Sequence, residues 1–330
     1  MDQAVKFVVV GSGNIATTYL SAVNNIVDAE IVGVVSRKNQ KPDSLSKLPF
    51  FKSIAEVSVD FDAVMICTPN GLHHVYAVEA ANLKKHVLCE KPIDITLEAI
   101  DKMIRACQNN KVKLGVAYQR RYSSDNSIVK KLIDSGNLGT VFSVDLSVKN
   151  YRDGVYYNSS PYRGTYNIDG GGPFIQQASH YIDLYCWFFG KPQKIVSKLG
   201  TFVHDIEVED HGVAIAVHES GMIGAITAST ATKPGFPAKM EIYTSKGCLV
   251  LENDVITYWD IDGVVNPSVQ TENKNTHTGA ATAIVEDTTN HELIISDFVN
   301  AVKTDSDCLV TGESARNATE MILKIYDSQF

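Results

Sequence analysis

The first 120 positions alternate short apolar runs with stretches of helical periodicity. The runs that we expect to form strands lie at 6–10, 31–35, 49–52, 63–67, 87–89 and 112–118. The expected helices between them lie at 14–25, 73–85 and 96–109. Strands that are apolar on both faces are typical of parallel sheets covered by helices. The pattern therefore predicts an α/β domain over residues 1–122, built on a doubly wound parallel sheet.

After residue 122 the pattern changes to half-polar strands joined by short turns. We expect strands at 141–148, 195–202, 213–218, 222–230, 240–244 and 248–252. The turns at 219–221 and 245–247 are short enough for hairpins, which favours a mainly antiparallel sheet. Helical periodicity occurs at 127–135, 174–189, 291–303 and 313–326. Residues 123–330 are thus predicted to form a second, α+β domain.

Composition and charge narrow the class of protein. A length of 330 residues suits two domains, and 44% apolar with 21% charged residues is typical of a globular chain. The net charge of −8 argues against nucleic acid or an anionic membrane as the main partner. No apolar run approaches the roughly 18 residues of a membrane span. The first residues also lack the layout of a signal peptide.

The six cysteines show no C-x-x-C spacing, so the sequence predicts neither a metal site nor a redox-active dithiol. Several of them lie inside apolar runs, as Cys67 and Cys89 do. Buried free thiols are typical of a reducing compartment, so we expect the protein in the cytoplasm.

A glycine-rich motif lies between the first expected strand and the first helix, where residues 11–16 read G-x-G-x-x-A. In that position Gly11 permits a tight turn, and Gly13 lets the backbone approach a pyrophosphate. The amides at the helix N-terminus can donate to phosphate oxygens. The sequence therefore predicts a dinucleotide site made of Gly11, Ser12, Gly13, Asn14 and Ile15.

The end of the second expected strand bears on the choice of cofactor. NAD sites usually place a carboxylate there to accept a hydrogen bond from the ribose 2′-hydroxyl. Here the strand is followed by Ser36, Arg37 and Lys38, with no carboxylate. Ser36 can donate to a 2′-phosphate, and Arg37 can neutralise the phosphate and stack on adenine. The sequence favours NADP(H), with NAD or the use of both cofactors as the alternative.

Further motifs follow in a specific order along the chain. They are Cys67-Thr68-Pro69-Asn70 with His73, Glu90-Lys91-Pro92, Tyr118-Gln119-Arg120-Arg121-Tyr122, Tyr162-Arg163-Gly164-Thr165, Gly170-Gly171-Gly172 and the helix with His180. Together with the glycine motif, they resemble the Gfo/Idh/MocA family of oxidoreductases over nearly the whole chain. The resemblance implies an N-terminal Rossmann domain and a C-terminal domain whose open, mainly antiparallel sheet forms homodimers or homotetramers. It also implies hydride transfer between NAD(P) and a hydroxyl or ketone of a sugar, polyol or sugar derivative.

The same resemblance implies Lys91 and His180 as the catalytic pair, because in that family the corresponding lysine and histidine face the nicotinamide. The assignment suits the chemistry of alcohol oxidation, which needs a base near neutral pKa and a group that stabilises charge on the substrate oxygen. His180 would take the hydroxyl proton, and Lys91 would hydrogen-bond the oxygen. The residues that the resemblance assigns to cofactor binding are Cys67, Thr68, Pro69, Asn70, His73, Glu90, Lys91 and Gln119.

One position departs from the family pattern. Many relatives carry Asp four residues before this histidine, whereas here the residue is Gln176. Glutamine can hydrogen-bond a substrate hydroxyl but cannot relay a proton. Asp183 lies three residues after His180, on the same helix face. It either orients the imidazole or pairs with a neighbouring residue of its domain.

Other side chains are candidates for substrate binding. Arg121 and Arg163 could meet a carboxylate or phosphate of the substrate, or they are ordinary solvated arginines. Tyr162 is one of five tyrosines in the segment 151–166. These tyrosines offer stacking and hydroxyl contacts to a sugar ring, or they pack in a core or an interface.

Two functions besides a dehydrogenase stay open. One is a sensor that binds NADP(H) without turnover, and the other is an NAD-dependent glycosidase that oxidises its substrate only transiently. The presence of both Lys91 and His180 argues against a sensor, and the basic loop at 36–38 argues against the glycosidase. The products separate the three functions: a stable ketone with net cofactor reduction, no reaction, or a released aglycone without net reduction.

Overall fold

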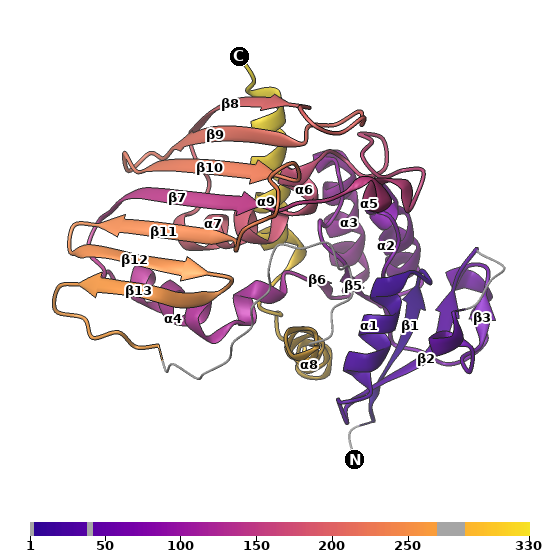
Figure 1. Ribbon diagram of the computed structural model, residues 1–330. Coiled ribbons are helices and arrows are strands. Elements are labelled where there is room, and N and C mark those ends of the chain that lie inside the picture. The colour runs from indigo at the N-terminus through magenta and orange to yellow at the C-terminus, as the bar shows by residue number, and fades with distance from the viewer. Residues whose placement is uncertain (1–2, 38–41, 269–287) are drawn as a thin grey trace. The chain divides into compact units, whose positions relative to one another are not determined.

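The structure is a computed structural model that describes residues 3–37, 42–268 and 288–330 (Figure 1). The chain divides into two compact units. The first unit comprises residues 1–119 and 283–319, and the second comprises residues 120–282 and 320–330. Each unit is built around one sheet.

The sheet of the first unit is parallel, and its described strands follow the order β3-β2-β1-β4-β5-β6. These strands are β1 (Val5–Val10), β2 (Ala29–Val35), β3 (Phe50–Phe51), β4 (Ala63–Ile66), β5 (His86–Cys89) and β6 (Leu114–Val116). The helices of the unit include α1 (Asn14–Val23), α2 (His73–Asn82), α3 (Leu97–Asn110) and α8 (Thr289–Thr304). The predicted doubly wound parallel sheet is confirmed.

The centre of this sheet explains where a ligand can bind. β1 is apolar on both faces, and Phe7, Val8 and Val9 are fully buried. The chain winds outward from β1 through β2 to β3, and then in the opposite direction through β4, β5 and β6. A sheet of this kind leaves a crevice outside the carboxyl ends of the strands where the order reverses. That crevice lies at the ends of β1 and β4.

The second unit contains a mixed sheet whose described strands follow the order β13-β12-β11-β7-β10-β9-β8. The strands are β7 (Val141–Lys149), β8 (Lys194–Gly200), β9 (His211–Val217), β10 (Ile223–Ser229), β11 (Lys239–Thr244), β12 (Gly247–Glu252) and β13 (Val255–Ile261). Neighbours are antiparallel except for β7 and β10, which are parallel. The helices of this unit are α4 (Ser124–Asp134), α5 (Gly154–Asn158), α6 (Pro173–Gln176), α7 (Ser179–Phe189) and the end of α9 (Gly312–Asp327). The expected mainly antiparallel sheet is confirmed.

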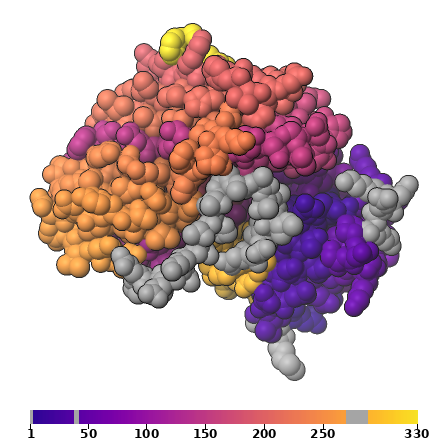
Figure 2. Space-filling view, in the orientation of Figure 1, coloured from indigo at the N-terminus to yellow at the C-terminus, as the bar shows by residue number. Residues whose placement is uncertain are grey.

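The two faces of the second sheet differ in exposure. Residues alternate between the faces along each strand. One face is buried, with Val144, Leu146 and Ile226 at no more than 2% exposure, and it packs against helices such as α6. The opposite face presents exposed apolar side chains, namely Val196, Val213, Ile215, Ile223 and Tyr258. Figure 2 shows side chains of β7 and of its neighbours forming a continuous surface.

The division of the chain differs from the prediction in its second half. The sequence pattern assigns all of 123–330 to the second domain, whereas residues 283–319, which include α8, belong to the first unit. There Phe298 of α8 packs against Phe7, with 6.1 Å between ring centroids, and Thr311 forms a bridge with Gly115. An amphipathic helix reveals in its sequence that one face is buried, but not which core it joins.

Several elements also differ locally. The helix expected at 174–189 is two helices, α6 and α7, separated at Gln177 and Ala178. The sequence pattern did not predict α5 or β13. Two features of the described residues agree with the expectations. None of their helices is long and apolar enough to cross a membrane, and all six cysteines are free thiols.

Candidate active site

The glycine motif forms the tight turn between β1 and α1. Gly11 has φ +116°, and a Cβ there would lie 2.5 Å from the carbonyl oxygen of Cys67, so no other residue fits without movement. Gly13 is the N-cap of α1, and apart from its chain neighbours no atom of the described residues lies within 4 Å of the position that its Cβ would occupy. The described residues therefore leave space beside Gly13, at the start of the helix. A helix N-terminus beside open space fits the pyrophosphate of a dinucleotide.

The end of β2 lies against this turn. Ser36 is 7% exposed, and its hydroxyl is 2.8 Å from that of Ser12. Arg37 is exposed, with its guanidinium carbon 6.0 Å from the centre of the Tyr76 ring. Lys38 lies outside the described residues. The described end of the strand therefore offers a hydroxyl and a guanidinium, which suit a phosphate better than a hydroxyl group.

The loop that carries Lys91 begins where β5 ends. The carboxylate of Glu90 accepts hydrogen bonds from the Tyr19 hydroxyl at 2.8 Å and from the Lys91 amide at 3.1 Å. Tyr19 is on α1 and is 1% exposed; burial and the neighbouring Glu90 raise its pKa well above the usual value. The phenol therefore stays protonated and donates to Glu90, which anchors the start of the loop.

Two histidines at the start of α2 hold the same loop from its other end. The ring nitrogens of His73 each lie 2.9 Å from a carbonyl oxygen, one of Thr68 after β4 and one of Pro92 after Lys91. The next residue, His74, binds the carboxylate of Asp94 through its amide and its ring, both at 2.9 Å. His73 is fully buried, so it joins the two loops. A direct contact of His73 with the cofactor stays a prediction.

The remaining residues that sequence analysis assigned to the cofactor lie at the same strand ends. Cys67 follows β4 and is 7% exposed. Burial, and to a smaller extent the negative charge of the nearby Glu90, raises the pKa of its thiol well above the usual value. Pro69 precedes a single turn of 3-10 helix, Asn70–Leu72, and Gln119 begins another, Gln119–Tyr122. The structure thus brings most of these candidates to one edge of the parallel sheet, as the sequence predicted.

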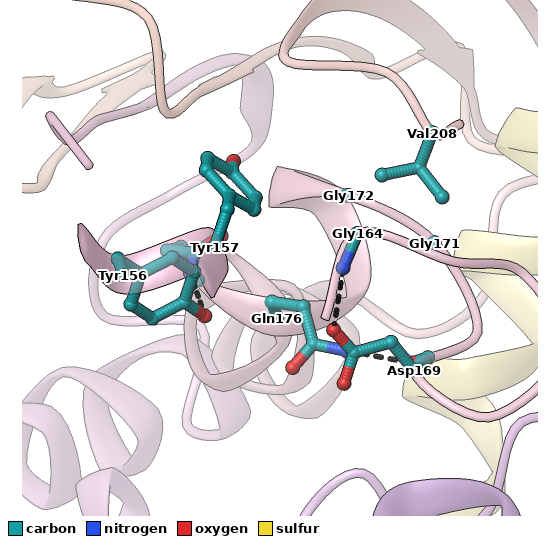
Figure 3. Close-up of a pocket in the computed structure, with 9 residues that line it drawn as sticks. Tyr156, Tyr157, Gly164, Asp169, Gly171, Gly172, Gln176 and Val208 are labelled. Carbon is teal, nitrogen blue, oxygen red and sulfur yellow. Dashed lines mark hydrogen bonds between the residues drawn. The ribbon is translucent and has the colours of Figure 1, made fainter. Parts of the chain in front are cut away.

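In the second unit, a pocket forms between α5 and the segment that leads to α7 (Figure 3). The residues that line it are Tyr156, Tyr157, Gly164, Asp169, Gly171, Gly172, Gln176, Gln177 and Val208. The carboxylate of Asp169 accepts a hydrogen bond from the amide of Gly164 at 3.0 Å, and its carbonyl accepts one from the side chain of Gln176 at 2.6 Å. These bonds fix the back of the pocket to the start of α6.

The polar groups of the pocket suit a ligand hydroxyl. The Tyr156 oxygen accepts hydrogen bonds from Nη1 of Arg163 at 2.8 Å and from Nε2 of Gln177 at 3.2 Å. With two bonds accepted, the Tyr156 hydroxyl can donate its own proton to a ligand. Oε1 of Gln177 is buried and has no hydrogen-bond partner among the residues that the structure describes. The phenol is thus a hydrogen-bond donor, and the amide oxygen an acceptor, among the residues that line the pocket.

Arg121 and Asp183 form a buried ion pair in the second unit. Nε and Nη2 of Arg121 lie 2.8 and 2.5 Å from the two oxygens of Asp183. Arg121 is 3% exposed and Asp183 is fully buried. This geometry fits the second of the two alternatives for Asp183, pairing within its own domain. The orienting role toward His180, and substrate binding by Arg121, stay predictions.

The other candidates of the second unit lie around α6 and α7. His180 is in the first turn of α7 and is partly buried. Tyr162 is partly buried in the loop after α5, with its carbonyl bound by the hydroxyl of Thr165 at 2.7 Å. Gln177 and Tyr156 carry the pocket chemistry, yet sequence analysis did not single them out. Their only signals were the tyrosine-rich segment and the position of Gln177 beside Gln176.

Glu209 explains the three-glycine motif. Its carboxylate accepts hydrogen bonds from the amides of Gly172 at 2.9 Å and Phe174 at 3.3 Å, and from the hydroxyl of Tyr326 at 3.1 Å. A Cβ at Gly172 would collide with the Glu209 carbonyl, and one at Gly171 with the Tyr326 hydroxyl. Burial raises the pKa of Glu209 to about 7. Nothing in the sequence pattern pointed to this residue.

Comparison with known proteins covers most of the chain. A family model described as an oxidoreductase family with an NAD-binding Rossmann fold matches residues 5–118. A second model, described as the GFO/IDH/MocA C-terminal domain, matches residues 127–250. The two models thus match residues in both units of the chain.

Individual proteins show the same likeness. Inositol 2-dehydrogenase of Rhizobium meliloti is 27% identical over 259 residues, which is 76% of each chain. The scyllo-inositol 2-dehydrogenase (NADP(+)) IolW of Bacillus subtilis is 25% identical over 63% of this chain and 58% of its own. Among solved structures, the WlbA dehydrogenase of Bordetella pertussis in complex with NADH and UDP-GlcNAcA matches with a TM-score of 0.86. It is 26% identical, over 99% of this chain and 96% of that one.

Proposed function

The chain belongs to the Gfo/Idh/MocA family of oxidoreductases, and from this premise we propose how its residues perform the reaction. The protein is an NAD(P)-dependent oxidoreductase that acts on a hydroxyl or ketone of a sugar, polyol or sugar derivative. The observation that carries the proposal is the placement of the glycine turn and the Lys91 loop at one edge of the parallel sheet. That edge is where such sheets bind dinucleotides.

The residues present fit a dinucleotide. Gly11 and Gly13 would let the pyrophosphate approach the N-terminus of α1, and Ser36 with Arg37 would meet the adenosine ribose. We favour NADP(H) because a guanidinium and a hydroxyl, rather than a carboxylate, follow β2. Relatives differ on this point: the name of IolW specifies NADP(+), whereas the WlbA structure contains NADH.

We assign the chemistry to Lys91 and His180. When bound, the nicotinamide accepts or supplies the hydride. His180 would remove the proton from the substrate hydroxyl, since imidazole is an efficient general base at neutral pH. The Lys91 ammonium would hydrogen-bond the same oxygen and stabilise the negative charge that develops on it. In the reducing direction, the two groups would return a proton to the oxygen.

The pocket of the second unit supports a polyhydroxylated substrate. Tyr156 can donate a hydrogen bond and Gln177 can accept one, and Gln176 lies beside them on α6. This pairing selects a neutral hydroxyl, because an anion has no proton to give to the Gln177 oxygen. The UDP-GlcNAcA in the WlbA structure makes nucleotide-linked sugars one class worth including in a substrate screen.

A binding titration followed by a substrate screen tests the function. Purified protein, freed of copurified nucleotide, is titrated with NADPH and NADH by nicotinamide fluorescence. A panel of inositols, aldoses and nucleotide sugars is then screened at the nicotinamide absorbance. We expect net cofactor reduction with at least one of them, and its loss in Lys91→Met and His180→Asn. Binding of neither cofactor would overturn the proposal.

We also propose that the protein forms homo-oligomers through the exposed face of the second sheet, as the family resemblance implies. The exposed apolar side chains on β8, β9, β10 and β13 support this assembly, since burying them would remove apolar area from water. The free cysteines support a reducing compartment such as the cytoplasm. Light scattering of Ile215→Lys against the unmodified protein tests the assembly.

A further inference from the structure

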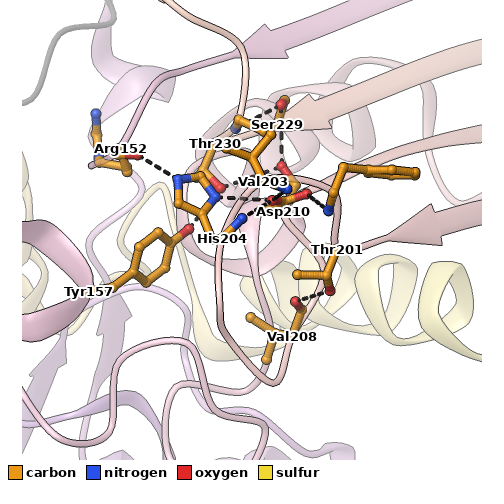
Figure 4. A network of polar contacts seen from close by, with 11 residues as sticks. Arg152, Tyr157, Thr201, Val203, His204, Val208, Asp210, Ser229 and Thr230 are labelled. Carbon is orange, nitrogen blue, oxygen red and sulfur yellow. Dashed lines mark hydrogen bonds and ion pairs between the residues drawn. The ribbon is translucent and has the colours of Figure 1, made fainter. Parts of the chain in front are cut away.

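Asp210, just before β9, organises a network of polar contacts in the second unit (Figure 4). Its fully buried carboxylate accepts hydrogen bonds from three successive amides, those of Phe202 at 2.9 Å, Val203 at 2.8 Å and His204 at 3.0 Å. Its carbonyl accepts another from the amide of Thr230 at 2.8 Å. Asp210 therefore holds the loop between β8 and β9 against the end of β10.

The ring of His204 extends this network in two directions. Nδ1 lies 3.0 Å from the Asp210 carboxylate, and Nε2 lies 2.8 Å from the carbonyl oxygen of Arg152. Carboxylate and carbonyl oxygens only accept hydrogen bonds, so a ring nitrogen that binds either of them does so as a donor. The Asp210 carboxylate and the Arg152 carbonyl thus hold the imidazole ring from its two sides. Burial alone would raise the pKa of Asp210, but the amide and imidazole hydrogen bonds lower it overall.

These contacts lead directly to the pocket. Arg152 lies two residues before α5, the helix that carries Tyr156 and Tyr157. The His204 ring packs against the ring of Tyr157 with 4.9 Å between centroids. The hydroxyl of Tyr157 is 2.7 Å from that of Thr230, whose amide Asp210 binds. Tyr156 and Tyr157 both line the pocket, so the network reaches its wall through α5.

We propose that the hydrogen-bonded pair of His204 and Asp210 is a positioning device that holds α5, and with it Tyr156 and Tyr157, in the geometry that binds substrate hydroxyls. The inference rests on the proposed function, because it takes the pocket to be where the sugar binds. His204 and Asp210 act through α5, so their loss weakens substrate binding more than it slows hydride transfer. Cofactor affinity, which depends on the first unit, is unaffected.

The first test uses steady-state kinetics with the best sugar of the panel. In His204→Gln, whose amide nitrogen can reach only one of the two acceptors, we expect KM to rise about tenfold, the size of one charge-assisted hydrogen bond. kcat should change less than KM, and the dissociation constant of NADPH should not change. The control is His211→Gln on β9, whose ring contacts Phe202 of the same loop at 6.1 Å between centroids. An unchanged KM in His204→Gln, or an equal loss of cofactor affinity, would overturn the device.

Two further measurements need no substrate. Nitrogen-15 NMR of the unmodified protein should show both ring nitrogens of His204 in hydrogen bonds, and a ring that shows neither contact would overturn the inference even if the variant does not fold. Amide hydrogen exchange at Tyr156 and Tyr157 should accelerate in His204→Gln and not in His211→Gln. If these two results hold while no sugar is turned over, the proposed function fails and the positioning contact stands. If turnover is found but the variant behaves normally, the device alone fails.

Discussion

The two units hold their functional residues by different physical means. In the first unit, the Lys91 loop is fixed largely through backbone groups at the ends of parallel strands: His73 binds two carbonyls, and Glu90 binds the Lys91 amide. In the second unit, the pocket and the helices around it are fixed by contacts of buried ionisable side chains with other side chains. These are Asp210 with His204, Glu209 with Tyr326, and Asp183 with Arg121.

The difference indicates where each unit is vulnerable. The partners of His73 and Glu90 at these strand ends are uncharged backbone groups, so the first unit should respond less to the removal of a single charge. A buried charge that loses its partner is costly, so the second unit should respond strongly to pH and to the removal of a single charge. Both tryptophans, Trp187 on α7 and Trp259 on β13, lie in the second unit. Their fluorescence therefore reports the unfolding of that unit.

The largest effect should come from the buried ion pair. Asp183→Asn leaves the Arg121 guanidinium buried without its counter-charge, and we expect a loss of about 3–5 kcal/mol in the free energy of unfolding. Denaturation by urea, followed by tryptophan fluorescence, measures it. The matched control is Asp101→Asn in the first unit, which breaks the more exposed pair with Arg316. This change should cost under about 1 kcal/mol in the free energy of unfolding, as measured by hydrogen exchange. Equal costs for the two variants would contradict the comparison.

A smaller effect, dependent on pH, should come from Glu209. Burial raises its pKa from 4.5 to about 7, so the folded state binds this proton more tightly than the unfolded state does. Stability should therefore fall as the pH rises from about 4.5 to about 7, by up to about 3 kcal/mol, and then level off. Glu209→Gln should remove this part of the slope, because its amide mimics the protonated acid. Identical pH profiles for the two proteins would show that Glu209 is not perturbed.

The same contrast explains what the sequence could reveal. Short apolar runs and the G-x-G-x-x-A turn are local patterns, so they identify the parallel sheet, Gly11 and the Lys91 loop. The contact between Asp210 and His204 joins residues only six apart, yet no periodicity or motif marks them. Their other partners are three backbone amides and a backbone carbonyl, and any residue type can supply those groups. Glu209 meets Gly172 and Tyr326 only after the second sheet has formed. Likewise, the apolar pattern of α8 predicts a buried face but does not indicate that Phe298 packs against Phe7.

Within the first unit, the backbone contacts can be tested at His73. The side-chain amide of His73→Asn is too short to reach both carbonyls, so the loops after β4 and β5 lose their link. We expect kcat to fall roughly tenfold, or about 1.4 kcal/mol, because Lys91 is less well placed. The free energy of unfolding should fall less in His73→Asn than in Asp183→Asn. The control is His86→Asn at the start of β5, which should leave kcat unchanged; equal loss in both variants would remove the positioning role.

The smallest effect should arise at the exposed end of β2. Arg37→Ala removes a guanidinium that is free to meet the 2′-phosphate of NADPH, and since the side chain is exposed the loss should be about 1 kcal/mol, or roughly fivefold in affinity. NADH has no such phosphate, so its affinity should not change. The NADPH effect should shrink as salt is raised, because ions screen an exposed charge, whereas the Glu209 profile of the second unit should change little. Fluorescence titration of both cofactors at two salt concentrations measures this. An equal loss for NADH would place Arg37 on the adenine or the pyrophosphate instead and would remove the basis for a preference for NADP(H).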